Sequence, residues 1–91
     1  MIPAFEKYAG PSSLKLTIGS LTIWFSYKTP VAFQVYGQEL KICQNRWAQT
    51  TGKHLNAIDP DKTKRIPFGD LIAELERHLE GIDCALEGLR A

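Results

Sequence analysis

The sequence has little cysteine, little net charge and no long apolar run, and each shortage excludes a class of protein. Its 91 residues include two cysteines, Cys43 and Cys84, which are too few for the disulfide framework of a small secreted domain. The formal net charge is +1, so no overall attraction to nucleic acid or membrane is expected. No apolar stretch approaches the length of about 18 residues that a spanning helix needs. We therefore expect a cytoplasmic protein without a membrane partner.

Alternating apolar residues begin at Leu14 and continue to Ile42, the pattern of strands whose sheet has one buried face. Glycine and proline interrupt the alternation and predict turns at Gly19-Ser20, Thr29-Pro30 and Gly37-Gln38. Residues 1–13 lack this periodicity and are expected to form an N-terminal arm before a single domain over 14–91. The predicted fold class is α+β, with a four-stranded antiparallel meander sheet packed on one long C-terminal helix.

The C-terminal helix is predicted to start at Pro67 and to reach about Arg90. Its apolar residues repeat with heptad spacing, and a helix of this length, on the order of 36 Å, is longer than strands of about 17–27 Å. The residues expected to project beyond the sheet are Ile82, Leu86 and Leu89. Because an exposed apolar stripe usually marks an interface, these three are the predicted contact of a homo-oligomer.

The segment between sheet and helix contains the Gly52-Lys53 pair, which suggests a phosphate-binding loop. A Walker A loop requires glycine five positions before Gly52 and a hydroxyl after Lys53, whereas the chain has Trp47 and His54 there. A structural interpretation fits better: Asn45 caps a short helix that Gly52 ends, with Trp47 as a buried anchor.

Catalytic and metal-binding chemistry has little support in the residues. Cys43, His54, His78 and Cys84 are suitable zinc ligand types, but they lack the close CxxC or HxxxH spacing of a zinc site. The carboxylates after Ile66 fit the solvated face of the helix. We expect no catalytic residues, no metal and no cofactor, and hence no enzyme.

Charge is unevenly distributed along the chain. Residues 41–65 contain six basic and two acidic residues, a balance of +4, whereas residues 66–91 contain two basic and six acidic, a balance of −4. The basic segment also has more polar side chains than helix caps require. It is the candidate surface for nucleic acid, whose phosphates attract such residues. The predicted binding residues are Arg46, Thr50, Thr51, Lys53, His54, Asn56, Lys64 and Arg65.

Two stretches, TIWFSYKTPVAF over Thr22 to Phe33 and NRWAQTTGKHLN over Asn45 to Asn56, resemble a family of small uncharacterised proteins found largely in phages and mobile elements. The resemblance implies a viral or plasmid origin, hence the host cytoplasm, and no particular activity. The favoured hypothesis is a non-enzymatic, homo-oligomeric protein-interaction module, with a host protein as a possible partner. The alternative is a small nucleic-acid-binding protein that uses residues 41–65.

Overall fold

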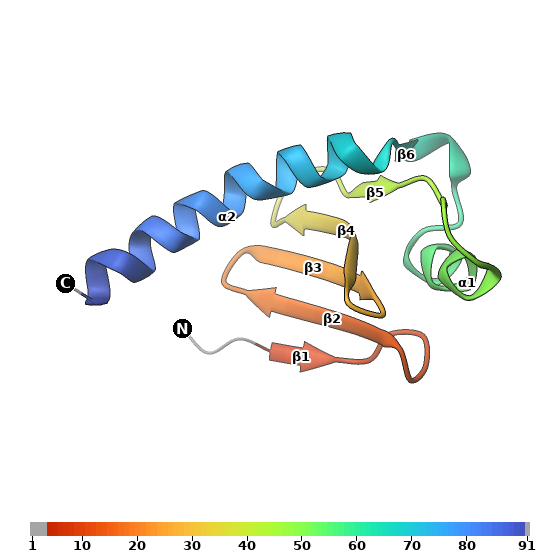
Figure 1. The fold of residues 1–91 in the computed structure, drawn as a ribbon, viewed down its shortest axis with the longest axis horizontal. Helices are drawn as coiled ribbons and strands as arrows, with labels where there is room; N and C mark the ends of the chain where they lie inside the picture. Colours follow the sequence, from red (N-terminus) through yellow and green to blue (C-terminus); the bar gives the residue numbers. More distant parts are fainter. Residues whose placement is uncertain (1–3, 91) are drawn as a thin grey trace.

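Six strands form one sheet, which carries a long helix on one face and a short helix at one end (Figure 1). The computed structural model describes the backbone of residues 4–90 and the side chains of residues 4–79. The elements, in chain order, are β1 (Ala4–Glu6), β2 (Ser13–Ile18), β3 (Leu21–Ser26), β4 (Thr29–Val35), β5 (Lys41–Cys43), α1 (Gln49–Ile58), the 3₁₀ turn η1 (Lys62–Lys64), β6 (Arg65–Ile66) and α2 (Phe68–Arg90).

The α+β class is confirmed, and the sheet is larger than the predicted meander. Strands β1 to β5 pair antiparallel in chain order, and β6 adds a parallel edge beside β5. The two strands that the sequence did not predict are β1 and β6. They have only three and two residues, which is too short to show an alternating pattern. The expected arm over residues 1–13 therefore supplies a strand, since Phe5 pairs with Leu16 at the β1 edge.

Two of the three predicted turns differ from those observed. The β3–β4 hairpin turns at Tyr27-Lys28, while Pro30 lies within β4 opposite Phe25, next to a shift in register. A proline is tolerated at such an irregularity because the regular ladder of N–H donors is already interrupted. Gly19 (φ 60°) turns as expected, whereas Gly37 (φ 81°) belongs to a longer loop over residues 36–40.

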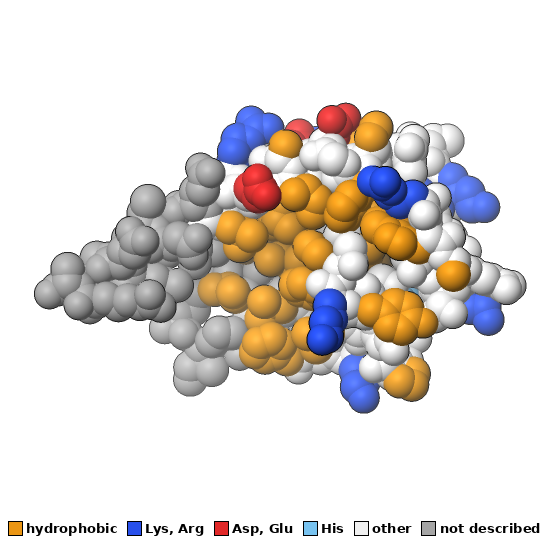
Figure 2. Space-filling view, in the orientation of Figure 1, with side chains coloured by type: hydrophobic (Ala, Val, Ile, Leu, Met, Phe, Trp, Pro, Cys, Tyr) orange, Lys and Arg blue, Asp and Glu red, His pale blue; other side chains and the backbone are white. Residues whose placement is uncertain are grey.

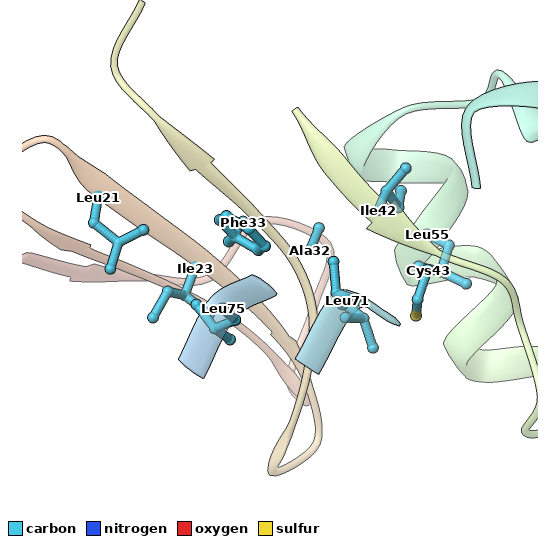
Figure 3. Close-up of a cluster of buried hydrophobic side chains, with 10 residues drawn as sticks. Leu21, Ile23, Ala32, Phe33, Ile42, Cys43, Leu55, Leu71 and Leu75 are labelled. Atoms are coloured by element: carbon cyan, nitrogen blue, oxygen red, sulfur yellow. The ribbon is translucent and has the colours of Figure 1, made fainter. Parts of the chain in front are cut away.

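Leucine side chains of α2 pack on one face of the sheet. Leu71 and Leu75 belong to one buried cluster with Ile23 and Phe33 (Figure 3), and α2 packs mainly on β4 and β5. The helix begins where predicted, since the carbonyl of Pro67 accepts hydrogen bonds from the N–H groups of Asp70 (3.0 Å) and Leu71 (3.1 Å). The side chains of Ile82, Leu86 and Leu89 lie outside the described residues, so their predicted interface stays a prediction.

The face of the sheet that α2 covers continues apolar beyond the helix. One cross-strand row runs Phe33, Ile23, Leu16 and Phe5, from β4 out to β1. Phe33 and Ile23 are each 3% exposed, Leu16 is half-buried and Phe5 is 63% exposed. Hydrophobic side chains gather over the sheet on the face shown in Figure 2. We call the part over β1–β3 the uncovered apolar face, a name that refers to the described side chains of α2 only. It consists of Phe5, Leu14, Leu16, Ile18 and Phe25.

Helix α1 starts and ends later than the sequence predicts. It begins at Gln49 after Ala48, which provides no side-chain cap, and it continues through Gly52 to Ile58. Asn45 instead stabilises the turn before the helix, because its side-chain oxygen accepts the N–H of Trp47 (3.0 Å). Gly52 serves close packing, since a Cβ there would lie 3.0 Å from Asn45 Nδ2.

Candidate functional site

A buried polar cluster joins α1 to the end of β3. Ser26, Thr51 and His54 are each at most 5% exposed, and we call them the Ser26–Thr51–His54 network. The Ser26 hydroxyl donates to Thr51 Oγ1 (3.0 Å), and Ser26 Oγ lies 2.7 Å from His54 Nδ1. Thr51 and His54 occupy one side of α1 because residues three apart on a helix are neighbours.

The hydrogen bonds assign a protonation state to His54. Ser26 has one proton, and it goes to Thr51, so His54 Nδ1 carries hydrogen and donates to Ser26 Oγ. Burial disfavours the charged ring and holds the pKa of His54 below its ordinary value of about 6.5. His54 is therefore neutral at neutral pH, with Nε2 as an acceptor.

Two tyrosines cover the His54 ring. Tyr8 meets it edge-on with centroids 5.9 Å apart, and Tyr27 lies at 6.1 Å. The Tyr8 hydroxyl donates to the Phe25 carbonyl (2.7 Å), and burial raises the pKa of Tyr8 to about 12. Tyr27 is held at φ 57°, a conformation that non-glycine residues seldom adopt. The segment before β2 therefore closes over the network.

The pairing of a serine with a histidine suggests nucleophilic catalysis, but the geometry here favours a structural role. A catalytic serine must be reachable and must lose its proton to the histidine. Ser26 is 2% exposed and its proton is directed at Thr51, while His54 donates to it. The network is thus arranged to fasten α1 to β3.

The structure gives the eight predicted binding residues several environments. Thr51 and His54 are buried in the network, whereas Thr50 and Lys53 are exposed on α1. Arg46 lies over the Phe68 ring at 5.6 Å, and Lys64 pairs with Asp59 at 3.5 Å. Asn56 and Arg65 are brought together, because Arg65 donates from one terminal nitrogen to Asn56 Oδ1 (2.8 Å).

Asn56 and Arg65 line a polar hollow of about 320 Å³ between α1, the loop after β5 and η1. The other lining residues are Gln44, Asn45, Gly52 and Lys62, none of which the sequence prediction placed in the site. Gly52 and Asn56 are four residues apart on one helix and so face the same way. That spacing, followed by Lys62 and Arg65, is the signal in the sequence that points to the hollow.

Cys43 is a buried residue of the hydrophobic core, and its thiol is not reactive. It is buried and unpaired, and burial raises the pKa of its thiol to about 11, so the nucleophilic thiolate is scarce at neutral pH. Within the described part of the chain, no three His, Cys, Asp or Glu side chains converge as metal ligands. Cys84, a member of the four-residue set considered above, lies outside the described side chains.

These features define a small α+β domain whose polar side chains divide between a buried network and an exposed hollow. The chain belongs to a family of unknown function (DUF8033), whose model matches residues 6–72. The match includes the network, the hollow and the first turn of α2. No curated protein and no solved structure matches the chain significantly. Among the residues described, no helix has the length and apolarity to cross a bilayer.

Proposed function

We propose that the protein is a non-enzymatic interaction module that associates with a second copy of itself through the uncovered apolar face. The supporting observation is the row Phe33, Ile23, Leu16 and Phe5, in which exposure rises from 3% beside α2 to 63% at the β1 edge. A sheet face of this composition is stabilised by another apolar layer. The described part of α2 supplies that layer mainly over β4 and β5.

A second copy is the proposed occupant because the chain carries a suitable apolar stripe. The heptad spacing that puts Leu75 in the core continues in the sequence through Ile82, Leu86 and Leu89. A partner helix bearing this stripe matches the chemistry with which α2 covers its own sheet. The proposal thus joins the predicted helix residues to the part of the apolar sheet face that lies over β1–β3. Origin in a phage or mobile element stays a prediction from the resemblance, as does a host-protein partner.

The test is the molecular mass of the protein in solution, and its change when one charged side chain is introduced into the uncovered apolar face. We expect a dimer of the 10.2 kDa chain by light scattering, and dissociation when Phe5→Glu places a carboxylate on the uncovered apolar face. Phe5 is already 63% exposed, so the substitution should leave the fold intact by circular dichroism. Leu86→Glu combined with Leu89→Glu should also dissociate the dimer.

Tyr36→Glu is the matched control. Tyr36 is an exposed aromatic residue, 89% accessible, that lies with Thr17, Thr22 and Gln34 on the opposite face of the sheet. Its substitution should leave the dimer unchanged. A monomer at every concentration, or equal dissociation by Phe5→Glu and Tyr36→Glu, would rule out the proposed interface.

Nucleic-acid binding is the second candidate, and it is favoured by the exposure of Lys53 on α1 and of Lys62, which lines the hollow with Arg65. Phosphate contacts release counterions, so affinity for single- or double-stranded oligonucleotides should fall steeply with salt. Fluorescence titration with labelled oligonucleotides at low salt tests this candidate. No binding to either form, together with a stable dimer, would favour the interaction module.

A further inference from the structure

The polar hollow beside α1 has the composition of an anion site. Its lining consists of two cationic side chains, three amide side chains and one glycine, with no carboxylate. The volume of about 320 Å³ suits a small ion or the phosphorylated end of a larger molecule. This feature is independent of self-association, since it lies at the α1 end of the molecule.

Two asparagines present donors because their oxygens are already engaged. Asn45 Oδ1 accepts the N–H of Trp47, which fixes the amide and turns Nδ2 toward Gly52. Asn56 Oδ1 accepts from Arg65, so Asn56 Nδ2 remains for another acceptor. Both orientations follow from hydrogen bonds that only an oxygen can accept.

The nearby carboxylates are committed elsewhere. Asp59 pairs with Lys64 and accepts the N–H of Asp61, while Asp61 accepts from the N–H and hydroxyl of Thr63. Within the described part of the chain, no ion pair joins a carboxylate to Lys62 or Arg65. Arg65 Nε is also buried without a hydrogen-bond partner there. The cationic charge of the hollow is therefore left for a ligand.

We propose that this hollow binds a phosphoryl group, a tetrahedral oxyanion that accepts hydrogen bonds from Lys62, Arg65, Asn45 and Asn56. Charge-assisted hydrogen bonds to such oxygens are the strong ones, and guanidinium groups suit them geometrically. Gly52 leaves room for the Asn45 amide, because a Cβ at that position would lie 3.0 Å from Asn45 Nδ2. The phosphoryl group belongs to a small phosphorylated molecule or to a nucleic-acid backbone, which share this chemistry.

The first experiment is a titration with inorganic phosphate at constant ionic strength, followed by amide and side-chain NMR shifts. Saturable shifts should cluster at Asn45, Gly52, Asn56 and Arg65. Lys62→Gln should weaken binding about tenfold, because it removes a charge that lines the hollow and forms no ion pair with a described carboxylate. Lys53→Gln removes the same charge from an exposed α1 position outside the lining, and its affinity should change about twofold or less.

A second variant guards against a purely electrostatic result. Gly52→Ala adds one methyl group without altering charge and raises helix propensity, so the fold should persist while phosphate binding falls. Unsaturable shifts, equal losses in Lys62→Gln and Lys53→Gln, or full binding by Gly52→Ala would each overturn the site.

The source of the phosphoryl group is settled by a second ligand. A short single-stranded oligonucleotide that binds more tightly than inorganic phosphate, and loses affinity in both Lys62→Gln and Gly52→Ala, identifies a nucleic-acid backbone. Equal or weaker binding of the oligonucleotide, with phosphate binding retained, identifies a small phosphorylated molecule. Either result supports the site, and a monomeric protein that still binds phosphate separates it from the proposed self-association.

Discussion

Helix α2 reaches the sheet through Leu71 and Leu75, whereas α1 reaches it through Leu55 and the Ser26–Thr51–His54 network. The apolar contact is non-directional, so α2 needs only a stripe of the correct spacing to remain docked. The polar contact depends on the positions and protonation of three side chains. Loss of one leucine should therefore weaken the whole fold, and loss of one network atom should act chiefly on α1.

The largest effect is expected from Leu71→Ala. Leu71 is fully buried, so the substitution removes apolar contacts and leaves a cavity, lowering the free energy of unfolding by about 2–5 kcal/mol. Ile72→Ala, at the next and half-buried helix position, should cost clearly less. Urea denaturation of both variants measures the difference. Equal losses would mean that α2 docks on a different face.

Ser26→Ala should come next. It leaves His54 Nδ1–H and the Thr51 hydroxyl buried without their partner, which should lower the free energy of unfolding by about 1–3 kcal/mol. Hydrogen exchange should show α1 amides losing protection before those of α2. Ser20→Ala, in the exposed β2–β3 turn, is the control and should lie within roughly 0.5 kcal/mol of the unmodified protein. Uniform loss of protection in both helices would contradict a network that acts on α1.

The same contrast explains what the sequence could predict. The apolar face of the sheet and α2 rest on local periodicity, and both were found, as was a helix in the middle segment. The network joins residues 25 and 28 positions apart, and no local pattern reports that Ser26 faces Thr51 and His54. Thr51 and His54 therefore looked like exposed binding residues. Asn45 and Gly52 were assigned to capping because close packing between them exists only in the folded chain.

Trp47→Ala tests the segment between β5 and α1. The sequence suggested a buried anchor, but Trp47 is 40% exposed and stacks edge-on against Phe68, with centroids 5.0 Å apart. An aromatic pair at the surface contributes about 0.5–1.5 kcal/mol, so thermal unfolding should shift modestly. Tyr36→Ala, at an aromatic residue without such a contact among the described pairs, should shift it less. A loss above about 3 kcal/mol would restore the buried-anchor interpretation.

The smallest effect on stability is expected from a change of pH alone. The pKa of His54 is lowered in the folded protein by burial, so below about pH 6.5 the unfolded chain takes up a proton before the folded one does. The stability of the fold should therefore decrease as pH falls from 6.5 toward the lowered pKa, and it should be insensitive to His54 above that range. Tyr8, which faces the ring, has a pKa of about 12 and does not titrate there.

The contribution of His54 to the pH dependence of stability is isolated by comparing the unmodified protein with a variant that lacks this histidine. Urea denaturation between pH 7.5 and 5 should show a loss in the unmodified protein that His54→Gln diminishes, since glutamine cannot titrate. His78→Gln, at an exposed position, is the control for the loss of a histidine elsewhere in the chain. If the profile of His54→Gln matched that of the unmodified protein, the ring would be protonated equally easily in the folded and unfolded states. The docking of α1 would then not depend on a neutral His54, and the contrast with α2 would rest on geometry alone.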